Sequence, residues 1–264
     1  MKLVDILVFT NGHGRYLKKC ILSLKKQTFI NYNIKLFNNH RSNIDRFIIN
    51  LVDDYYHCPK IKGPSALRNF GINKANSKYI TIIDGDDFWN KEKLKFQLNK
   101  IKNNPQCLVY TNIYNVINNQ LFLNKNKLHK GDMFLKLVKD EVSIAGSMSS
   151  IMIKRNFLSK LKNKYGYIFD QKLNYCEDFD FFIRISTFCK FQFVNKPLVY
   201  INNYNTSHQS KFTNIERSII KYRMINKNLG IHIFKNKSYL RIIIFLKGSI
   251  KIFIKKILYL KLFI

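Results

Sequence analysis

The sequence predicts an α/β protein with a mostly parallel central sheet flanked by helices. Three observations predict this fold class. Short apolar runs alternate with segments whose apolar residues recur at helical spacing, turn-forming Gly, Asn and Asp residues follow the runs, and no internal repeat interrupts the order. Strands that alternate with helices in this way form a layered fold, and its ligands bind beyond the carboxyl ends of the parallel strands.

The first hundred residues hold the most regular part of the pattern. The apolar run Leu3–Phe9 predicts a buried strand, and Gly12 and Gly14 separate it from a helix. Gly63-Pro64 marks a turn and the start of a later helix. In chain order we expect a strand at 3–9, a helix around 17–24, a strand at 33–37, a helix at 44–52, a helix from 64 to about 75, a strand at 79–83 and a helix around 94–101.

The second half of the chain is less regular. Asn118-Asn119 indicates a turn between two strands, and Pro197 interrupts the last strand pattern. In chain order we expect strands at 108–117, 120–123 and 149–153, a helix that begins near Glu177, and strands at 191–194 and 198–201. Since no flexible linker precedes about residue 205, we expect one domain at 1–210, followed by a helical, basic tail at 211–264.

The composition excludes several classes of protein. The 264 residues are 46% hydrophobic, which excludes a disordered or fibrous chain. Five cysteines without a CxxC pair favour a reducing cytosol over a disulfide framework or zinc cluster. We expect no signal peptide, because the first apolar run is short and carries Asp5, and no membrane-spanning helix, because no stretch reaches about 18 apolar residues.

The charge is strongly positive. Against 46 Lys and Arg stand 16 Asp and Glu, a formal net charge of +30. Such a balance favours anionic partners, namely phosphates, anionic lipid or nucleic acid. The cations are dispersed along the chain and no RNP-like, zinc-finger or helix-turn-helix pattern is present, so nucleic acid is not an expected partner.

The few carboxylates gather in two clusters. Three of them lie in DGDD at 84–87, directly after a predicted strand, and three lie in EDFD at 177–180. An Asp-x-Asp at a strand end suits Mg²⁺ or Mn²⁺ carried in with a diphosphate, and the alternative is an Asp-rich turn that caps the backbone. For EDFD, the alternatives are a general base for a hydroxyl group and acids that complement a helix dipole.

The order of motifs from about residue 3 to about residue 203 resembles a known family. The motifs are VDILVFTNGHGRYLKKCILSLKKQTF, GPSALRNFGINKA, SKYITIIDGDDFWNKEKL, SSIMIKRNFL, YCEDFDFFIRIS and KPLVYINN. Together they resemble the family 2 glycosyltransferases, which have the Rossmann-like GT-A fold and are inverting enzymes that use nucleotide-activated sugars. The resemblance implies transfer from a nucleotide-sugar, with a UDP-sugar favoured, to a hydroxyl of a glycan or glycolipid acceptor.

The resemblance also implies which residues bind the donor. Thr10 and Asn11 stand where the family contacts base and ribose, and Asn38 stands where an Asp usually reads the base. Arg68 stands on the nucleotide side of the donor, although it could also be a surface charge. Trp89 either packs on the sugar or belongs to the core.

The acidic motifs receive chemical roles from the same resemblance. Asp84 would approach the ribose, Asp86 would bind the divalent metal, Mn²⁺ or Mg²⁺, and Asp87 would support them. Asp178 stands at the position of the catalytic base, with Glu177 beside it. The base would deprotonate the acceptor hydroxyl in a single displacement at the anomeric carbon.

The end of the chain carries two further expectations. Where relatives place a His close to the metal, this chain has Tyr204, and His208 four residues later is a weaker candidate ligand. In the tail, Arg241, Lys247, Lys251, Lys255 and Lys261 fall within an arc of about 160° on a helical projection. This pattern favours an amphipathic segment in an anionic membrane interface over a helix that covers the domain.

These expectations lead to one first choice and two rivals. The first is a peripheral enzyme on the cytoplasmic face of the inner membrane that builds lipopolysaccharide, lipooligosaccharide, O-antigen or capsule. The first rival is an Asp-x-Asp phosphohydrolase with Asp84 as nucleophile, and the second is a non-enzymatic basic protein that binds membranes or nucleic acid. The sequence leaves open whether the protein is a homodimer.

Overall fold

A nine-stranded sheet organises the molecule. The computed structural model describes residues 2–12, 14–138, 142, 144–173 and 176–202. The strands are β1 (Val4–Thr10), β2 (Tyr32–Asn38), β3 (Asp54–His57), β4 (Tyr79–Asp84), β5 (Phe88–Trp89), β6 (Cys107–Ile117), β7 (Gln120–Leu123), β8 (Met152–Lys154) and β9 (Lys190–Asn202). Their order is β3-β2-β1-β4-β8-β6-β9-β5, with β7 paired to β6. The first four strands are parallel, as are β6 and β9.

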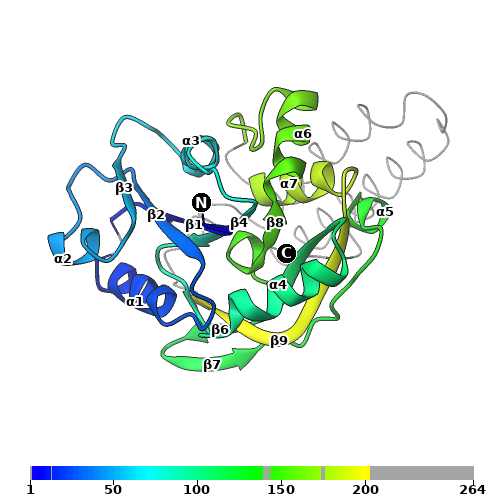
Figure 1. The fold of residues 1–264 in the computed structure, drawn as a ribbon, viewed down its shortest axis with the longest axis horizontal. Helices are drawn as coiled ribbons and strands as arrows, with labels where there is room; N and C mark the ends of the chain where they lie inside the picture. The colour runs from blue at the N-terminus through cyan, green and yellow to red at the C-terminus, as the bar shows by residue number, and fades with distance from the viewer. Residues whose placement is uncertain (1, 13, 139–141, 143, 174–175, 203–264) are drawn as a thin grey trace, which may run out of the picture.

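Helices cover both faces of this sheet. They are α1 (Gly14–Lys25), α2 (Arg46–Ile49), α3 (Pro64–Asn73), α4 (Lys93–Asn103), α5 (Phe134–Val138), α6 (Arg155–Tyr165) and α7 (Glu177–Ile185), with a 3₁₀ turn η1 (Ser147–Ser150). Figure 1 shows α1 and α4 on one side of the sheet and α3, α6 and α7 on the other. The predicted α/β class with flanking helices is confirmed. None of the helices in the described ranges is long and apolar enough to cross a membrane.

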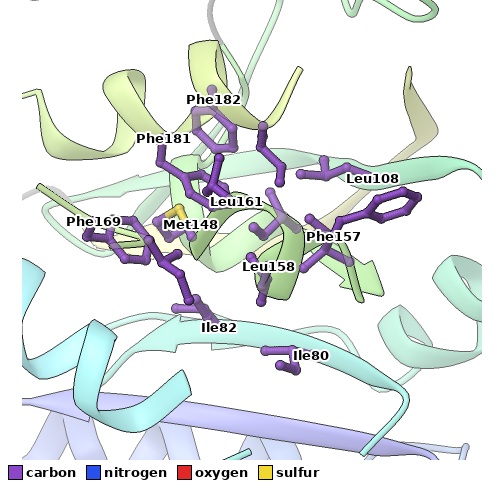
Figure 2. Packing of buried hydrophobic residues seen from close by; sticks show 14 of the residues in the cluster. Ile80, Ile82, Leu108, Met148, Phe157, Leu158, Leu161, Phe169, Phe181 and Phe182 are labelled. Atoms are coloured by element: carbon purple, nitrogen blue, oxygen red, sulfur yellow. The ribbon is translucent and has the colours of Figure 1, made fainter. Parts of the chain in front are cut away.

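The alternation of side chains along β4 divides the core in two. Ile80 and Ile82 face one way, toward Leu158 and the aromatic residues beneath α7 (Figure 2). Tyr79 and Ile83 face the other way, toward α1 and α4. Because successive side chains of a strand point to opposite faces, a nearly continuous apolar strand buries residues on both sides.

Three predicted elements differ in the structure. The helix predicted at 44–52 is wrong in extent, because Asp45 caps a single short helix, α2, and the chain then joins the sheet as β3. Ser149 and Ser150 lie in η1, so the strand predicted at 149–153 begins only at Met152. The two strands predicted around Pro197 are one strand, β9.

The proline is accommodated by an irregular register. Thr111 pairs with Val194, Asn112 with Pro197 and Ile113 with Val199, so β9 carries extra residues where the proline lies. A bulge of this kind removes the need for a backbone donor at the proline without ending the strand.

Lys93, the first residue of α4, is a fully buried lysine. It has no exposed surface, its Nζ lies 3.1 Å from Thr81 Oγ1 and 3.5 Å from the centroid of the Trp89 ring. Within the described part of the chain it forms no ion pair with a carboxylate. Burial therefore lowers the pKa of Lys93 well below its usual range.

Lys93→Met is expected to raise the free energy of unfolding at pH 7 by about 1 kcal/mol or more, or about 2–4 °C in Tm for a chain of this size. Because burial lowers the pKa of Lys93 in the folded protein, the unfolded chain binds more protons in the range between the folded pKa and about pH 10.4, and wild-type stability rises with pH across that range. The advantage of the variant should therefore shrink between pH 7 and pH 9.5 in thermal unfolding experiments.

The matched control is Lys95→Met, because Lys95 is an exposed residue of the same helix. It should change the Tm little at either pH. A lower Tm for Lys93→Met at pH 7 would contradict the assignment of a destabilising buried amine.

Candidate functional site

Three strand ends meet at one edge of the sheet. The parallel register places Thr10 beside Asn38 and Phe9 beside Asp84, so the residues that follow β1, β2 and β4 are neighbours. Gly85 allows the next turn to approach β1 closely, since a Cβ there would lie 2.9 Å from Thr10 Cβ. This is the sheet edge where ligands bind in open α/β folds.

The amide of Asn38 is used inside its own loop. Its Nδ2 donates to the Ser42 carbonyl at 2.9 Å, and its Oδ1 accepts from the His40 backbone at 3.0 Å. Asn38 is fully buried, whereas Asn11, on the neighbouring strand end, is exposed. Asn38 thus shapes the loop at 38–42, and Asn11 is the member of the predicted base-binding group that faces solvent.

Arg68 joins the two acidic clusters. From α3, its Nη1 donates to Asp178 Oδ1 at 2.8 Å and to Glu177 Oε1 at 3.2 Å. Its Nη2 donates to Asp84 Oδ1 at 3.1 Å. One guanidinium therefore connects the end of β4 with the start of α7, which lie more than ninety residues apart in the sequence.

Arg68 is buried and is held by the charges of its carboxylate neighbours. Arg68 is 5% exposed, and its guanidinium lies 5.6 Å from the centroid of the Phe169 ring. Burial lowers the pKa of Arg68, but the attraction of Asp178, Asp84 and Glu177 outweighs burial and raises it. The structure thus excludes the surface-charge alternative for Arg68, because the residue lies buried between the acids.

Asn69, the next residue of α3, fixes the same helix to the chain before α7. Its Nδ2 donates to the Phe169 carbonyl and its Oδ1 accepts from the Phe169 backbone, both at 2.8 Å. This two-way amide contact reproduces the pairing of a strand neighbour. It holds α3, and with it Arg68, in register with the segment that leads to Glu177.

The DGDD loop is held from two distant parts of the chain. Ser149 Oγ donates to Asp87 Oδ2 at 2.6 Å and accepts from the Asp84 backbone at 3.1 Å. The Asn202 backbone donates to Asp87 Oδ1 at 3.1 Å, and its side chain donates to the Asp86 carbonyl. Asp87 is 5% exposed, and burial, followed by the charges of Asp86 and Asp84, raises its pKa well above the usual range.

Trp89 lies in the core, which is the second of the two roles that the sequence left open for it. The indole is 3% exposed, and its Nε1 donates to the Ser149 carbonyl at 3.1 Å. Its ring packs over Lys93, and its hydrogen bond ties it to η1, whose Ser149 donates to Asp87 of the acidic loop.

Helix α7 presents Glu177 and Asp178 from a strained start. Cys176, just before it, has a φ of 63°, which turns the chain sharply into the helix. One turn later the fully buried Asp180 pairs with Arg184, whose Nη2 also donates to the Ile168 carbonyl at 2.8 Å. This buried pair fixes the helix, and its two leading acids, 18% and 23% exposed in their side chains, stay partly open.

The donor set suits a metal that arrives with a phosphate ligand. Asp86 is half-buried, and the Asp84 side chain is 39% exposed. The described residues assemble no group of three His, Cys, Asp or Glu side chains that could hold a metal ion alone. Mg²⁺ and its analogues commonly use one or two carboxylates plus substrate phosphates instead of such a cage, so the residues present fit that mode.

Sequence reasoning missed Ser149 and Asn202 as parts of the site. Both belong to motifs that carry the family resemblance, SSIMIKRNFL and KPLVYINN, but neither motif suggests a contact with DGDD. Tyr204, His208 and the tail at 211–264 lie outside the described residues.

Comparisons with known proteins agree on one family. The sequence profile of the family described as Glycosyl transferase family 2 matches residues 6–182. A glycosyltransferase of Methanocaldococcus jannaschii is 28% identical over 90% of this chain and 76% of its own length. One of Haemophilus influenzae is 32% identical over 42% of this chain and 47% of its own length.

Two further relatives have informative names. The Escherichia coli protein WfgD, a UDP-Glc:alpha-D-GlcNAc-diphosphoundecaprenol beta-1,3-glucosyltransferase, is 27% identical over 52% of this chain and 56% of its own length. The chain thus spans about half the length of this relative and of the Haemophilus one. The structure of S. aureus TarS 1-349 in complex with UDP-GlcNAc has a TM-score of 0.68 at 18% identity, covering 87% of this chain and 66% of that one. This likeness confirms the predicted GT-A fold.

Arg68→Met is expected to lower the free energy of unfolding by about 3–5 kcal/mol, because it leaves three carboxylates without their buried partner. Arg68→Lys should lose less, although a single ammonium cannot reproduce the forked contacts. Urea unfolding followed by the fluorescence of the one tryptophan measures both, and Arg41→Met, at an exposed arginine, is the control. Equal stabilities for Arg68→Met and the control would refute the role of Arg68 as the link.

Ser149→Ala is expected to cost about 1–3 kcal/mol of stability, since a buried carboxylate loses a donor and a buried N–H loses an acceptor. Ser159→Ala, at an exposed serine of α6, should change stability by less than about 0.5 kcal/mol. The same urea experiment compares the two alanine variants. If they unfold alike, the hydroxyl of Ser149 does not hold the acidic loop.

Proposed function

The chain belongs to glycosyltransferase family 2, and we propose that it transfers a sugar from a UDP-sugar, with inversion, to a hydroxyl of a cell-surface glycan intermediate. One observation carries the proposal: Arg68 holds Asp84 of the DGDD motif and Asp178 of the ED motif against a single guanidinium. The residue expected to contact the donor and the residue expected to act as base therefore belong to one connected site.

The proposed reaction is a single displacement. Asp178 takes the proton of the acceptor hydroxyl as that oxygen bonds to the anomeric carbon, and the bond to the nucleoside diphosphate breaks on the opposite side. Arg68 orients the Asp178 carboxylate through the 2.8 Å contact with Nη1. Glu177 accepts from the same guanidinium nitrogen and lies beside the base.

The donor would lie along the sheet edge. Asn11, exposed after β1, offers a polar group for base and ribose, and Thr10, buried beside Asn38, comes directly before it. The partly exposed carboxylate of Asp84 is accessible to a ribose hydroxyl. Asp86 would hold a divalent cation, Mn²⁺ or Mg²⁺, and when bound such a cation neutralises charge on a leaving diphosphate.

The relatives support the choice of substrates. WfgD is named for a UDP-glucose donor and a lipid-diphosphate acceptor, and TarS was solved with UDP-GlcNAc. A UDP-sugar and a lipid-linked glycan are accordingly the proposed pair for this chain. Such an acceptor would place the enzyme at the cytoplasmic face of the inner membrane, where its net charge of +30 favours anionic lipid.

Calorimetric titration of UDP, GDP and CMP, with and without Mn²⁺, tests the site. We expect UDP to bind only with the metal, Asp86→Asn to abolish this binding, and Asp178→Asn to retain it. Asp178→Asn should instead lower the rate of sugar transfer, measured as UDP formed from the UDP-sugar, by about 10²–10⁴-fold, the usual contribution of a general base. The control is Asp132→Asn at an exposed carboxylate, which should behave as wild type.

Each other outcome has a definite meaning. Metal-dependent binding of GDP or CMP in place of UDP keeps the transferase and replaces the donor. If no nucleotide binds to the folded protein, the proposed site is wrong. Release of inorganic phosphate from a simple phosphomonoester, lost in Asp84→Asn, would support the phosphohydrolase instead.

A further inference from the structure

The β6–β7 hairpin carries exposed apolar residues on either side of its polar turn, and these residues form its apolar tip. Its two-residue turn, Asn118-Asn119, has φ values of 50° and 62°, the left-handed conformation that suits a tight hairpin. Around it, Ile117 is 42% exposed, Leu121 53%, Phe122 47% and Leu123 46%. Figure 1 shows β7 at the periphery of the sheet, beyond β6.

Apolar side chains are exposed on both faces of β7. Leu121 and Leu123 pair with Val116 and Tyr114 on one face, and Phe122 pairs with Asn115 on the other. An ordinary edge strand alternates buried apolar residues with exposed polar ones, or carries charges that prevent association. β7 does neither, since three consecutive apolar residues are exposed and the strand contains no charge. Contiguous exposed apolar residues of this kind mark an interaction surface.

The surroundings of the hairpin tip are positively charged. No Asp or Glu occurs between Glu92 and Asp132 in the sequence. Directly after β7, Lys125, Lys127 and Lys130 are exposed. A partner that covers the apolar tip must therefore also accept a cluster of cations, which favours an anionic surface over a second copy of this basic chain.

Two tyrosines lie between the apolar tip and the body of the domain. Tyr114, directly opposite Leu123, stacks on Tyr200 of β9 with ring centroids 5.5 Å apart, and both are half-buried. Tyrosine is favoured at membrane–water interfaces because one end of the side chain is apolar and the other polar. An apolar tip, a pair of tyrosines and adjacent lysines together match the layers of a lipid interface.

We propose that the β6–β7 hairpin inserts its apolar tip into the interface of an anionic lipid bilayer. Residues at the tip would enter the boundary between headgroups and acyl chains, and the three lysines would contact the lipid phosphates. The biological purpose, bringing the site to a lipid-linked acceptor, rests on the proposed function. Insertion itself is measured without donor or acceptor, so either proposal can fail alone.

The experiment places a second tryptophan in the full-length chain. Phe122→Trp reports on the hairpin, and Ile30→Trp, at a residue that is 80% exposed elsewhere, is the matched control. Each variant is mixed with vesicles of phosphatidylglycerol and phosphatidylcholine whose acyl chains carry bromine. We expect the emission at position 122 to shift to shorter wavelength and to be quenched, whereas position 30 stays unquenched.

A second variant tests the energetics of the same contact. The triple replacement Leu121→Ser, Phe122→Ser and Leu123→Ser should lower vesicle partitioning at least about tenfold, because it removes the apolar area that enters the interface. Unchanged thermal unfolding in the absence of vesicles would show that the variant folds. Pure phosphatidylcholine vesicles should bind the wild type much more weakly than anionic ones.

Three results would overturn the proposal. Vesicle binding with no quenching at position 122 assigns the membrane contact to another part of the chain. A concentration-dependent blue shift at position 122 without vesicles assigns the hairpin to contact between two copies. Equal quenching at positions 122 and 30 shows adsorption without a specific orientation.

Discussion

The arrangement of the site depends on one buried cation. Arg68 faces three carboxylates, from β4 and α7, and without it these acids would repel one another. A buried arginine is unfavourable by itself, and only several charged acceptors make its position stable. The same ion pairs that permit α3, β4 and α7 to approach each other therefore assemble the candidate active site.

The DGDD loop depends on hydrogen bonds from residues in distant parts of the domain. Asp87 receives hydrogen bonds from Ser149 and Asn202, which follow it by 62 and 115 residues. Trp89 joins the same assembly through the carbonyl of Ser149. Local sequence supplies one turn, in which the Asp87 backbone donates to the Asp84 carbonyl at 3.0 Å, and the side-chain supports of DGDD come from distant elements. The loop acquires its geometry only when β9 and η1 are in place.

This division explains how much could be predicted from the sequence. Periodicity identified β1, β4, α1 and α4, because a buried strand and an amphipathic helix each leave a local apolar pattern. It did not identify α6 or the single strand β9, where a register shift accommodates Pro197. Motifs located DGDD and Glu177-Asp178, but a lone Arg68 among 46 Lys and Arg gives no signal that three acids surround it. Ion pairs between distant segments follow from the fold, and a single sequence does not contain them.

The distribution of charge gives the molecule two different electrostatic regions. At the sheet edge, Arg68 balances only part of the charge of its three carboxylates, and Asp86 adds to the excess. Elsewhere the chain is basic, and residues 93–131 contain no acid. An anionic diphosphate would be attracted to the protein at long range but repelled at the site itself unless a cation accompanied it. The excess of carboxylates at the site is consistent with the proposed metal-bound donor. The excess of Lys and Arg outside the site is consistent with the proposed anionic membrane surface.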